Sequence, residues 1–600
     1  MLKKTFRQFR WFFKYYKKEY IICLVCILIS YGTTMFPMYM IGNIADGIMD
    51  ETLTLHQLSL KLLLLLFIIA LNYGLGYVWE YYNNRASDEI TRISRQRIFQ
   101  HLLRQGPAFY AENTTGSLMG KATNDVDALR EFAGYGFMAF LDATVWPLII
   151  YTILLFISWR ITLVAVLPLP LLIFISRRLG TRLYQYYAES QESFDHMNEE
   201  VLEGISGIRV VRAYHLEEQQ KNRFAKRSED LYRKNMRAVR YSQMYGPAAL
   251  FLSGISLAIA LGMGLYEISA ARLTAGKLIT FTMYLTWLTW PMMAIGEFIV
   301  TAEQASASSN RIDQLLNQKP DVEDASLQLP MPVDSSIRFH NYSFEYPDNK
   351  GDTPVYALQN ISFYLKDGQT LGLVGPVGCG KSTLLRQLMH FYPLEEDQII
   401  IGGDSDLSEI NRSNLREKIA YVPQTTYLFS QTVKENILLG ASDEALESGW
   451  AEKRLEEVLD IADLRKDLPS LPKGIDSLAG EKGIALSGGQ KQRISIARAL
   501  MKDADILIMD DCLSAVDAIT ETHILKALRK DRAGRTTLIS AHRLSAVRDA
   551  DLILVMDKGE IVDRGTHEEL IERGGWYAAQ YQQQQLESHT ENADSRHERT

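Results

Sequence analysis

Cysteine is scarce in this sequence. Only Cys23, Cys26, Cys379 and Cys512 occur in 600 residues, which excludes a disulfide scaffold and leaves a reducing compartment open. A surplus of basic charge is also missing, because 64 Lys and Arg residues against 72 Asp and Glu residues give a net charge of −8. A nucleic-acid binder needs a concentrated basic face, so nucleic acid is excluded as a partner.

Long apolar runs fill the first half of the chain. They lie at residues 21–40, 58–79, 137–159, 161–176, 248–266 and 278–300. About 20 apolar residues cross a bilayer core of about 30 Å. A buried core helix explains any single run but not six in succession. The sequence therefore predicts an all-α, six-helix transmembrane domain over residues 1–316, in contact with the lipid bilayer.

Basic residues are unevenly distributed between these runs. The N-terminal segment and the long connections at 85–130 and 177–240 are rich in Lys and Arg, whereas the connection at 43–57 has neither. Basic connections stay in the cytoplasm, so we expect a multi-pass protein of the cell membrane, with both termini cytoplasmic. The two long connections have helical spacing, interrupted at 110–116 and 204–207, and predict hairpins whose tips touch a cytoplasmic domain.

The composition changes after Leu316. Residues 317–336 contain three prolines and little periodicity, which is typical of a linker. From Ile337 short apolar strands alternate with helices, so an α/β domain is predicted over 337–585. The polar tail at 586–600 is expected to be disordered.

A glycine-rich loop follows the predicted strand Thr370–Val374. It consists of Gly375, Pro376, Val377, Gly378, Cys379, Gly380, Lys381 and Ser382, and Thr383 opens the next helix. The spacing fits G-x-x-x-x-G-K-[ST], in which backbone amides surround phosphates, the lysine reaches the outer phosphates and the hydroxyl ligates Mg²⁺. Asp510 ends another apolar strand and is the second candidate Mg²⁺ ligand. ATP and Mg²⁺ are therefore the predicted cofactors.

A second motif resembles the signature of ATP-binding cassette (ABC) ATPases. It consists of Ser487, Gly488, Gly489 and Gln490. Six spans ahead of one cassette resemble an ABC exporter half-transporter. The resemblance implies that Tyr346 stacks on adenine, Gln424 senses Mg²⁺ and His542 contacts the γ-phosphate. It also implies a dimer, in which the signature of one cassette closes over the ATP on the partner's phosphate loop.

One residue departs from the family pattern. Asp511 occupies the position where the family usually has the glutamate that polarises the attacking water. Its carboxylate is one methylene too short for a well-placed base, so this site is expected to bind ATP well and hydrolyse it poorly. With an intact signature, the chain resembles the degenerate-site subunit of bacterial heterodimeric multidrug exporters, whose partner carries the glutamate. A homodimer with a slower aspartate base is the alternative.

The substrate is less clearly indicated. A hydrophobic or amphiphilic compound is the leading hypothesis, and a lipid or a peptide is the alternative; a non-transporting ABC ATPase would lack the spans. Asp142 and Glu297 lie in or near apolar runs, where acids either serve a substrate, such as a cationic amphiphile, or are solvated at the cytoplasmic ends. Tyr284, Trp287 and Trp290 either line a path for the substrate or anchor their helix at the interface.

Overall fold

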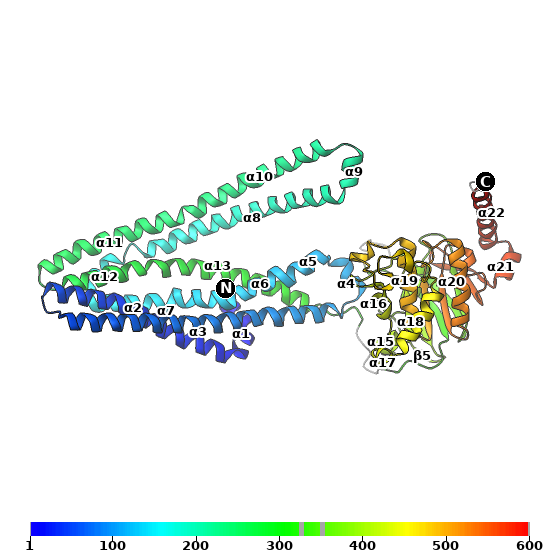
Figure 1. Ribbon diagram of the computed structural model, residues 1–600, viewed down its shortest axis with the longest axis horizontal. Helices are drawn as coiled ribbons and strands as arrows, with labels where there is room; N and C mark the ends of the chain where they lie inside the picture. Colours follow the sequence, from blue (N-terminus) through cyan, green and yellow to red (C-terminus); the bar gives the residue numbers. More distant parts are fainter. Residues whose placement is uncertain (1, 323–328, 348–354, 598–600) are drawn as a thin grey trace. The chain divides into compact units, whose positions relative to one another are not determined.

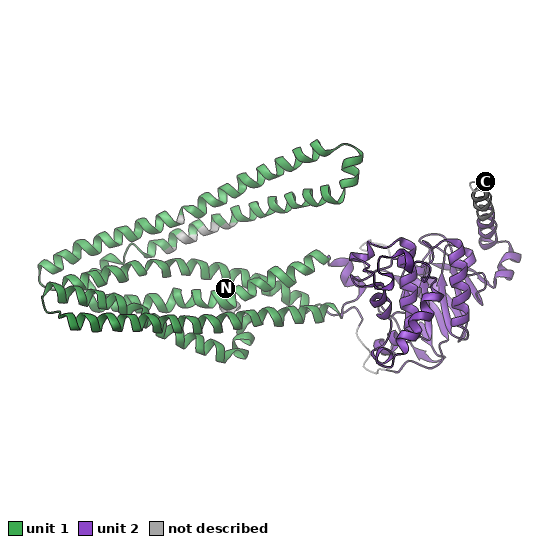
Figure 2. Ribbon diagram, viewed as in Figure 1, with its two compact units in different colours: residues 1–103, 115–318 green, residues 104–114, 319–600 purple. Residues whose placement is uncertain are grey.

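The chain forms two compact units, shown in Figure 2. The computed structural model describes residues 2–322, 329–347 and 355–597. Unit 1 comprises residues 1–103 and 115–318, and unit 2 comprises residues 104–114 and 319–600.

Unit 1 is entirely helical (Figure 1). Its elements are α1 (Leu2–Tyr15), α2 (Lys17–Met49), α3 (Leu55–Leu102), α5 (Thr115–Gly120), η1 (Lys121–Asp125), α6 (Val126–Glu131), η2 (Phe132–Gly136), α7 (Phe137–Ala165), α8 (Pro170–Ser206), α9 (Ile208–Ala213), α10 (Glu217–Gln243), α11 (Tyr245–Ser269), α12 (Ala275–Trp287) and α13 (Thr289–Leu316). The segments η1 and η2 are π-helical and continue directly into their neighbours. The expectation of an α-helical membrane domain is confirmed.

Five helices in the described part of the chain are long and apolar enough to cross a membrane. They are Lys17–Met49, Leu55–Leu102, Thr115–Ala165, Glu217–Ser269 and Ala275–Leu316. The helix that carries residues 170–176 of the fourth expected span, α8, is not among these five.

The expected boundary between the third and fourth spans lies at a kink in α7. Helix α7 covers Phe137–Ala165, but Ser158 has the non-helical angles φ −160° and ψ 104°, one residue before the expected end of the third span at Trp159. Arg160 follows this kink, and its guanidinium Nη1 lies 3.6 Å from Oε1 of Glu267 on α11. The chain turns again at 166–169 before α8 begins, where Pro168 and Pro170 have no amide hydrogen for an α-helical bond. The bounds of the two spans stay a prediction.

The two long connections are helical hairpins. In the first, the short helix α4 (Pro107–Glu112) lies between α3 and α5 and belongs to unit 2. In the second, α8 ends at Ser206, and α9 joins it to α10. Helices α8 and α10 pack against each other along this second hairpin.

Unit 2 is an α/β domain with two sheets (Figure 1). The strands are β1 (Ile337–Glu345), β2 (Tyr356–Leu365), β3 (Thr370–Val374), β4 (Ile399–Ile401), β5 (Ser405–Asp406), β6 (Ile419–Val422), β7 (Ile506–Asp510), β8 (Thr536–Ser540), β9 (Leu552–Asp557) and β10 (Glu560–Gly565). The larger sheet has the order β10-β9-β3-β8-β7-β6, with β10 antiparallel and the others parallel. The smaller sheet, β2-β1-β4-β5, is antiparallel.

Helices surround the larger sheet. They are α14 (Lys381–Gln387), α15 (Arg412–Lys418), α16 (Val433–Leu438), α17 (Asp443–Glu447), α18 (Trp450–Ile461), α19 (Gly488–Met501), α20 (Ala518–Asp531), α21 (His567–Arg573) and α22 (Trp576–His597), with 3₁₀ turns η3 (Leu468–Ser470), η4 (Gly474–Asp476), η5 (Glu481–Gly483) and η6 (Leu544–Ala546). Strands β7 and β8 are buried at every residue. This buried parallel sheet holds the carboxyl ends of β3 and β7 in place. The candidate site residues lie at or just after these two strand ends.

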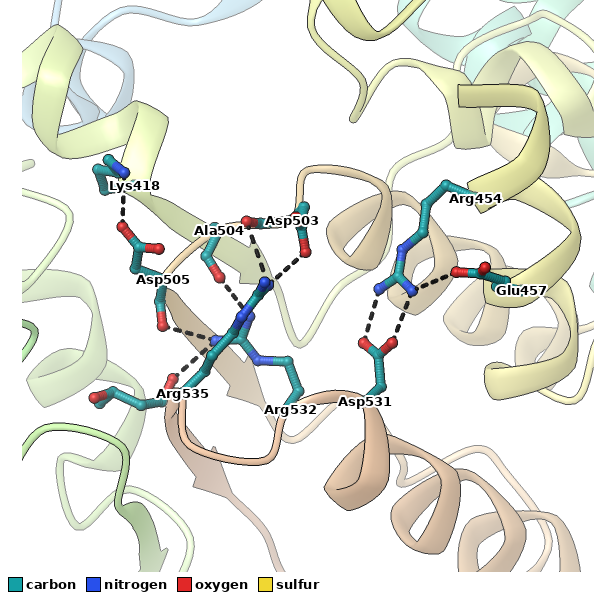
Figure 3. A network of polar contacts seen from close by, with 10 residues as sticks. Lys418, Arg454, Glu457, Asp503, Ala504, Asp505, Asp531, Arg532 and Arg535 are labelled. Carbon is teal, nitrogen blue, oxygen red and sulfur yellow. Dashed lines mark hydrogen bonds and ion pairs between the residues drawn. The ribbon is translucent and has the colours of Figure 1, made fainter. Parts of the chain in front are cut away.

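A polar network joins the helices on this sheet, as Figure 3 shows. Arg454 of α18 donates two bonds of 2.7 Å to the carboxylate of Asp531 at the end of α20. Arg532, which is buried, donates to the carbonyl oxygens of Ala504, Asp505 and Thr536. The network therefore ties α18 and α20 to the loop that precedes β7.

The disorder expected for the tail at 586–600 stays a prediction. Helix α22 extends through residues 586–597 and ends at His597, and 598–600 lie outside the described residues.

Candidate functional site

The loop between β3 and α14 adopts a backbone that requires glycine. Gly375, Gly378 and Gly380 have φ angles of 146°, 82° and 104°. A Cβ on Gly375 would lie 2.1 Å from the Met556 carbonyl oxygen, and one on Gly380 would lie 2.8 Å from that of Ala357. The loop is thus pressed against β9 and β2. Amides of such turns form a concave site for anions, which suits phosphate oxygens.

Lys381 is folded across this loop. Its Nζ donates to the carbonyl oxygens of Gly375 at 2.7 Å and Pro376 at 3.0 Å. Pro376 and Val377 form the exposed crest of the loop, whereas the side chain of Cys379 is only 3% exposed. Lys381 Nζ also donates to the Cys379 Sγ at 3.7 Å. The cation is therefore held where phosphates of a bound nucleotide would lie.

Ser382 and Asp510 are brought together from α14 and the end of β7. The Ser382 hydroxyl donates to Oδ1 of Asp510 at 2.7 Å, and the Tyr421 hydroxyl donates to Oδ2 at 3.3 Å. Burial and the Asp510 charge raise the pKa of Tyr421 to about 12, so its hydroxyl stays a donor. Hydroxyl and carboxylate oxygens are hard ligands that fit Mg²⁺. Among the described residues no three His, Cys, Asp or Glu side chains converge on a metal position, so a metal here takes its other ligands from phosphate and water.

Asp511 lies beside Gln424, the residue expected to sense Mg²⁺, and near His542, the residue expected at the γ-phosphate. Its Oδ2 accepts a bond of 3.4 Å from Gln424 Nε2 and lies 3.9 Å from His542 Nε2. The residue has φ of +45°, and its amide donates to the Ser540 carbonyl oxygen at 3.0 Å. A cavity of about 170 Å³ adjoins Asp511, Ser540 and His542. The structure thus places the candidate base and the histidine at this cavity, and the glutamine within hydrogen-bond distance of the base.

Tyr346 lies beside the start of α14. Its hydroxyl shares a 2.9 Å hydrogen bond with the Thr383 hydroxyl, and its ring packs edge-on against Tyr392 with centroids 5.6 Å apart. The aromatic expected at adenine is therefore next to the phosphate loop.

The signature residues form the N-terminus of α19. The Ser487 hydroxyl accepts a bond of 3.3 Å from the Gln490 amide, and Gln490 Oε1 accepts one of 3.0 Å from the Ser487 amide. This capping box satisfies amides that would otherwise lack a partner. Ser487 and Gly488 are exposed, and Gly489 is half-buried. Helix α19 packs against β6. Strands β7 and β8 lie between β6 and β3 in the sheet, so the signature is separated from the phosphate loop that follows β3.

Gln492 and Gln584 bond residues of the site, although neither was selected as a site residue from the sequence. Gln492 Nε2 donates to the Ser514 hydroxyl at 3.2 Å, and that hydroxyl donates to the Asp511 carbonyl oxygen at 3.0 Å. Gln584 of α22 donates to the His542 carbonyl oxygen at 2.9 Å. The only signal for Gln492 is its place on the same helix as the signature, one turn beyond Gly488.

Comparisons with known proteins cover both units. A family model described as the ABC transporter transmembrane region matches residues 20–292, and one described as ABC transporter matches residues 358–514. The chain is 40% identical over 577 residues to a probable multidrug resistance ABC transporter ATP-binding/permease protein of Bacillus subtilis (strain 168), covering 96% of this chain and 97% of that protein. It is 31% identical over 567 residues to an ATP-dependent lipid A-core flippase of Syntrophus aciditrophicus (strain SB), covering 94% of this chain and 92% of that protein. A bacterial Atm1-family ABC exporter with ATP bound has a similar structure, with a TM-score of 0.76 at 25% identity, covering 94% of this chain and 99% of that chain.

Proposed function

The chain belongs to the ABC transporter family as an exporter with a fused membrane domain and cassette, and on this premise we propose that it is the degenerate-site subunit of a heterodimeric multidrug exporter. Its cassette binds and hydrolyses ATP to drive transport. The substrate is a hydrophobic or amphiphilic compound that leaves the cell. The multidrug name of the Bacillus relative supports this substrate class.

Exposed apolar surface on the second hairpin supports a partner subunit. Around α9 the side chains of Leu202, Ile205, Ile208 and Val210 are 68%, 67%, 48% and 56% exposed. Contiguous exposed apolar residues on a hairpin tip are typical of an interaction site. Exporters of this type work as dimers, so a cassette of the second subunit is the natural partner for this tip.

Each residue of the phosphate site has a proposed task for ATP bound to this chain. Lys381 exchanges its two carbonyl contacts for phosphate oxygens, and Tyr346 holds adenine. Ser382 and Asp510 would hold Mg²⁺, with Gln424 beside it, and the ion would neutralise charge on the β- and γ-phosphates. His542 donates a hydrogen bond to the γ-phosphate. Ser487 to Gln490 serve the ATP of the partner, which agrees with their exposure and with the strands that separate α19 from β3.

The short carboxylate of Asp511 carries the heterodimer proposal. It is held by Gln424 at 3.4 Å, in the position of the usual glutamate. Catalysis falls on the order of 10²-fold for a displacement of about 1 Å. The partner subunit would therefore supply the glutamate at the second ATP site, which we call the efficient site. This chain completes that site with its signature residues.

The asymmetric distribution of basic residues supports an orientation with both termini and the cassette in the cytoplasm of a bacterial cell. Copurification of the chain from its native membrane tests the assembly. We expect a second cassette subunit with glutamate after its Mg²⁺-binding aspartate. Recovery of one kind of subunit alone would instead support the homodimer.

Transport is tested in inverted vesicles of the purified complex. We expect ATP-dependent accumulation of a neutral hydrophobic dye, and none with Lys381→Met. The family also includes lipid A-core flippases, so the alternative is a lipid exporter. ATP-dependent movement of a labelled lipid without any movement of the dye would establish that alternative.

A further inference from the structure

Two acid–aromatic pairs lie along the contact between α7 and α13. Tyr135, in η2 just before α7, donates to Oε2 of Glu297, and Trp290 Nε1 donates to Oδ2 of Asp142 at 3.3 Å. Helices α7 and α13 pack against each other. On each helix the acid and the aromatic donor are seven residues apart, which is two helical turns or about 10 Å. We call this antiparallel contact between α7 and α13 the seam. It contains two carboxylates that lie about 10 Å apart along the helix axes.

Asp142 lies deep in the membrane domain. It also accepts a hydrogen bond from the Tyr31 hydroxyl. Tyr31 is near the middle of the apolar run 21–40, and Trp290 is near the middle of the run 278–300. Both partners of Asp142 are thus about ten residues from either end of their runs. Solvation at a cytoplasmic end does not explain this acid.

Glu297 lies at a different level. Its partner Tyr135 precedes the apolar run that begins at Phe137, so Glu297 is at the end of the seam. The donors to both acids are hydroxyl and indole groups, which are neutral. Their hydrogen bonds stabilise a carboxylate but leave its charge uncompensated, and intramembrane acids are functional candidates for this reason.

Aromatic rings surround the deeper acid. The rings of Tyr31 and Trp146 have centroids 4.4 Å apart, and those of Trp146 and Trp287 are 5.8 Å apart. Trp287 and Trp290 are 42% and 50% exposed. The face of an aromatic ring attracts an organic cation. Exposed indoles next to a carboxylate therefore combine apolar contact with attraction for positive charge.

The helix backbone is irregular at both levels of the seam. Tyr135 belongs to the π-helical segment η2, and π-bulges occur frequently at functional sites. At the other level, α12 ends at Trp287 and α13 begins at Thr289. Pro291 has no amide hydrogen to bond the Trp287 carbonyl oxygen, which explains the break.

We propose that the seam of Asp142 and Glu297, lined by Tyr31, Tyr135, Trp287 and Trp290, binds hydrophobic organic cations. Glu297 meets the cation near the end of the seam, and Asp142 holds it at mid-depth between aromatic rings. The same charges disfavour an anionic lipid. The inference rests on the proposed exporter function and names the charge class of its substrate.

A pair of probes of nearly equal size and opposite charge tests this site. Tetraphenylphosphonium and tetraphenylborate are measured by equilibrium dialysis against the full complex in nanodiscs, with binding to empty nanodiscs subtracted. We expect the complex to prefer the cation. A preference for the borate, or none, overturns the proposal without the need for any variant.

Charge-neutral variants then locate the site. Asp142→Asn is expected to weaken tetraphenylphosphonium binding about tenfold, and Glu297→Gln by a smaller factor because its carboxylate is more exposed to solvent screening. Glu303→Gln, an exposed acid on the same helix α13, is the matched control and should leave binding unchanged. If Asp142→Asn does not fold, Glu297→Gln alone carries the test, and unchanged cation binding in the folded variants refutes the site.

Failure of the exporter proposal has a separate readout. Dialysis needs neither ATP nor transport, whereas accumulation of the neutral dye in vesicles does not depend on positive charge. Dye transport with no preference for the cation contradicts the cation site alone. Cation binding that Asp142→Asn weakens, without ATP-driven transport of any compound, supports the site and contradicts the exporter proposal.

Discussion

Lengthening Asp511 by one methylene should make this chain's own ATP site hydrolytic. Asp511 Oδ2 already lies 3.4 Å from Gln424 Nε2 and 3.9 Å from His542 Nε2, beside a cavity of about 170 Å³. Glutamate extends the carboxylate by about 1 Å, a distance to which catalysis is sensitive. A gain of roughly 10²-fold at this site follows from the usual penalty for such a displacement. At 1.36 kcal/mol per factor of ten, this gain is about 2.7 kcal/mol of activation free energy.

Steady-state ATPase assays of complexes purified with any native partner measure this effect. Asp511→Asn should retain most of the wild-type rate, because the partner's site supplies it. Ser487→Arg should abolish nearly all turnover, since it places bulk and charge over the partner's ATP. The double variant Ser487→Arg with Asp511→Glu should recover a measurable rate from this chain's own site. Glu444→Gln, an exposed acid on α17, is the control and should change nothing.

Two results would refute the reasoning. If Asp511→Asn is inactive and only one kind of subunit is present, both sites use Asp511 and the degenerate-site argument is wrong. If the double variant stays inactive, the length of the Asp511 side chain is not what limits this site.

Three further predictions follow from the cassette. Cys379 is 3% exposed, so a maleimide should label it slowly both with and without MgATP. Mass spectrometry measures this labelling, and fast labelling without nucleotide would contradict the loop conformation. Asp531→Ala removes the two bonds that Arg454 donates to Asp531 and leaves its buried guanidinium only the 3.0 Å bond to Glu457. It should lower the free energy of unfolding by about 3 kcal/mol in denaturant titrations, whereas an unchanged midpoint would mean that the pair contributes little. Burial lowers the pKa of His567, which bonds the Tyr577 hydroxyl at 2.8 Å. Below about pH 6.5 the unfolded chain therefore binds more protons than the folded chain, so the stability of the fold should fall as the pH drops through this range. In His567→Gln the melting temperature should fall less over the same pH range than in the wild type.

Features that depend on local residue patterns were predicted from the sequence. Strand β3 spans Thr370–Val374 as expected, because a buried parallel strand is a short apolar run. The glycines of the following loop have positive φ angles, which suits the expected turn of the backbone around phosphates. The kink of α7 at Ser158 lies one residue before the expected end of the third span. The second turn, at the prolines 168 and 170 before α8, was not selected from the sequence.

Features that depend on contacts between distant segments were not predictable. Asp142 and Trp290 are separated by 148 residues, and their hydrogen bond depends on the register between α7 and α13. The sequence marks each as unusual in an apolar run but contains no local signal for their pairing. The burial of the Cys379 thiol likewise depends on distant segments, because its loop packs against β9.

The cassette links two ATP sites through side chains of one helix. Under the proposed function, Ser487 at the start of α19 faces the partner's nucleotide, while Asp511 faces this chain's own nucleotide. Gln492, on the first turns of α19, bonds the Ser514 hydroxyl at 3.2 Å and accepts a bond of 2.9 Å from the Ala515 amide. Ser514 in turn bonds the Asp511 carbonyl oxygen. A displacement of α19 at the efficient site therefore strains the backbone that positions Asp511. A site with a poor base still senses its neighbour through these bonds, which gives a physical reason to retain a complete phosphate loop there.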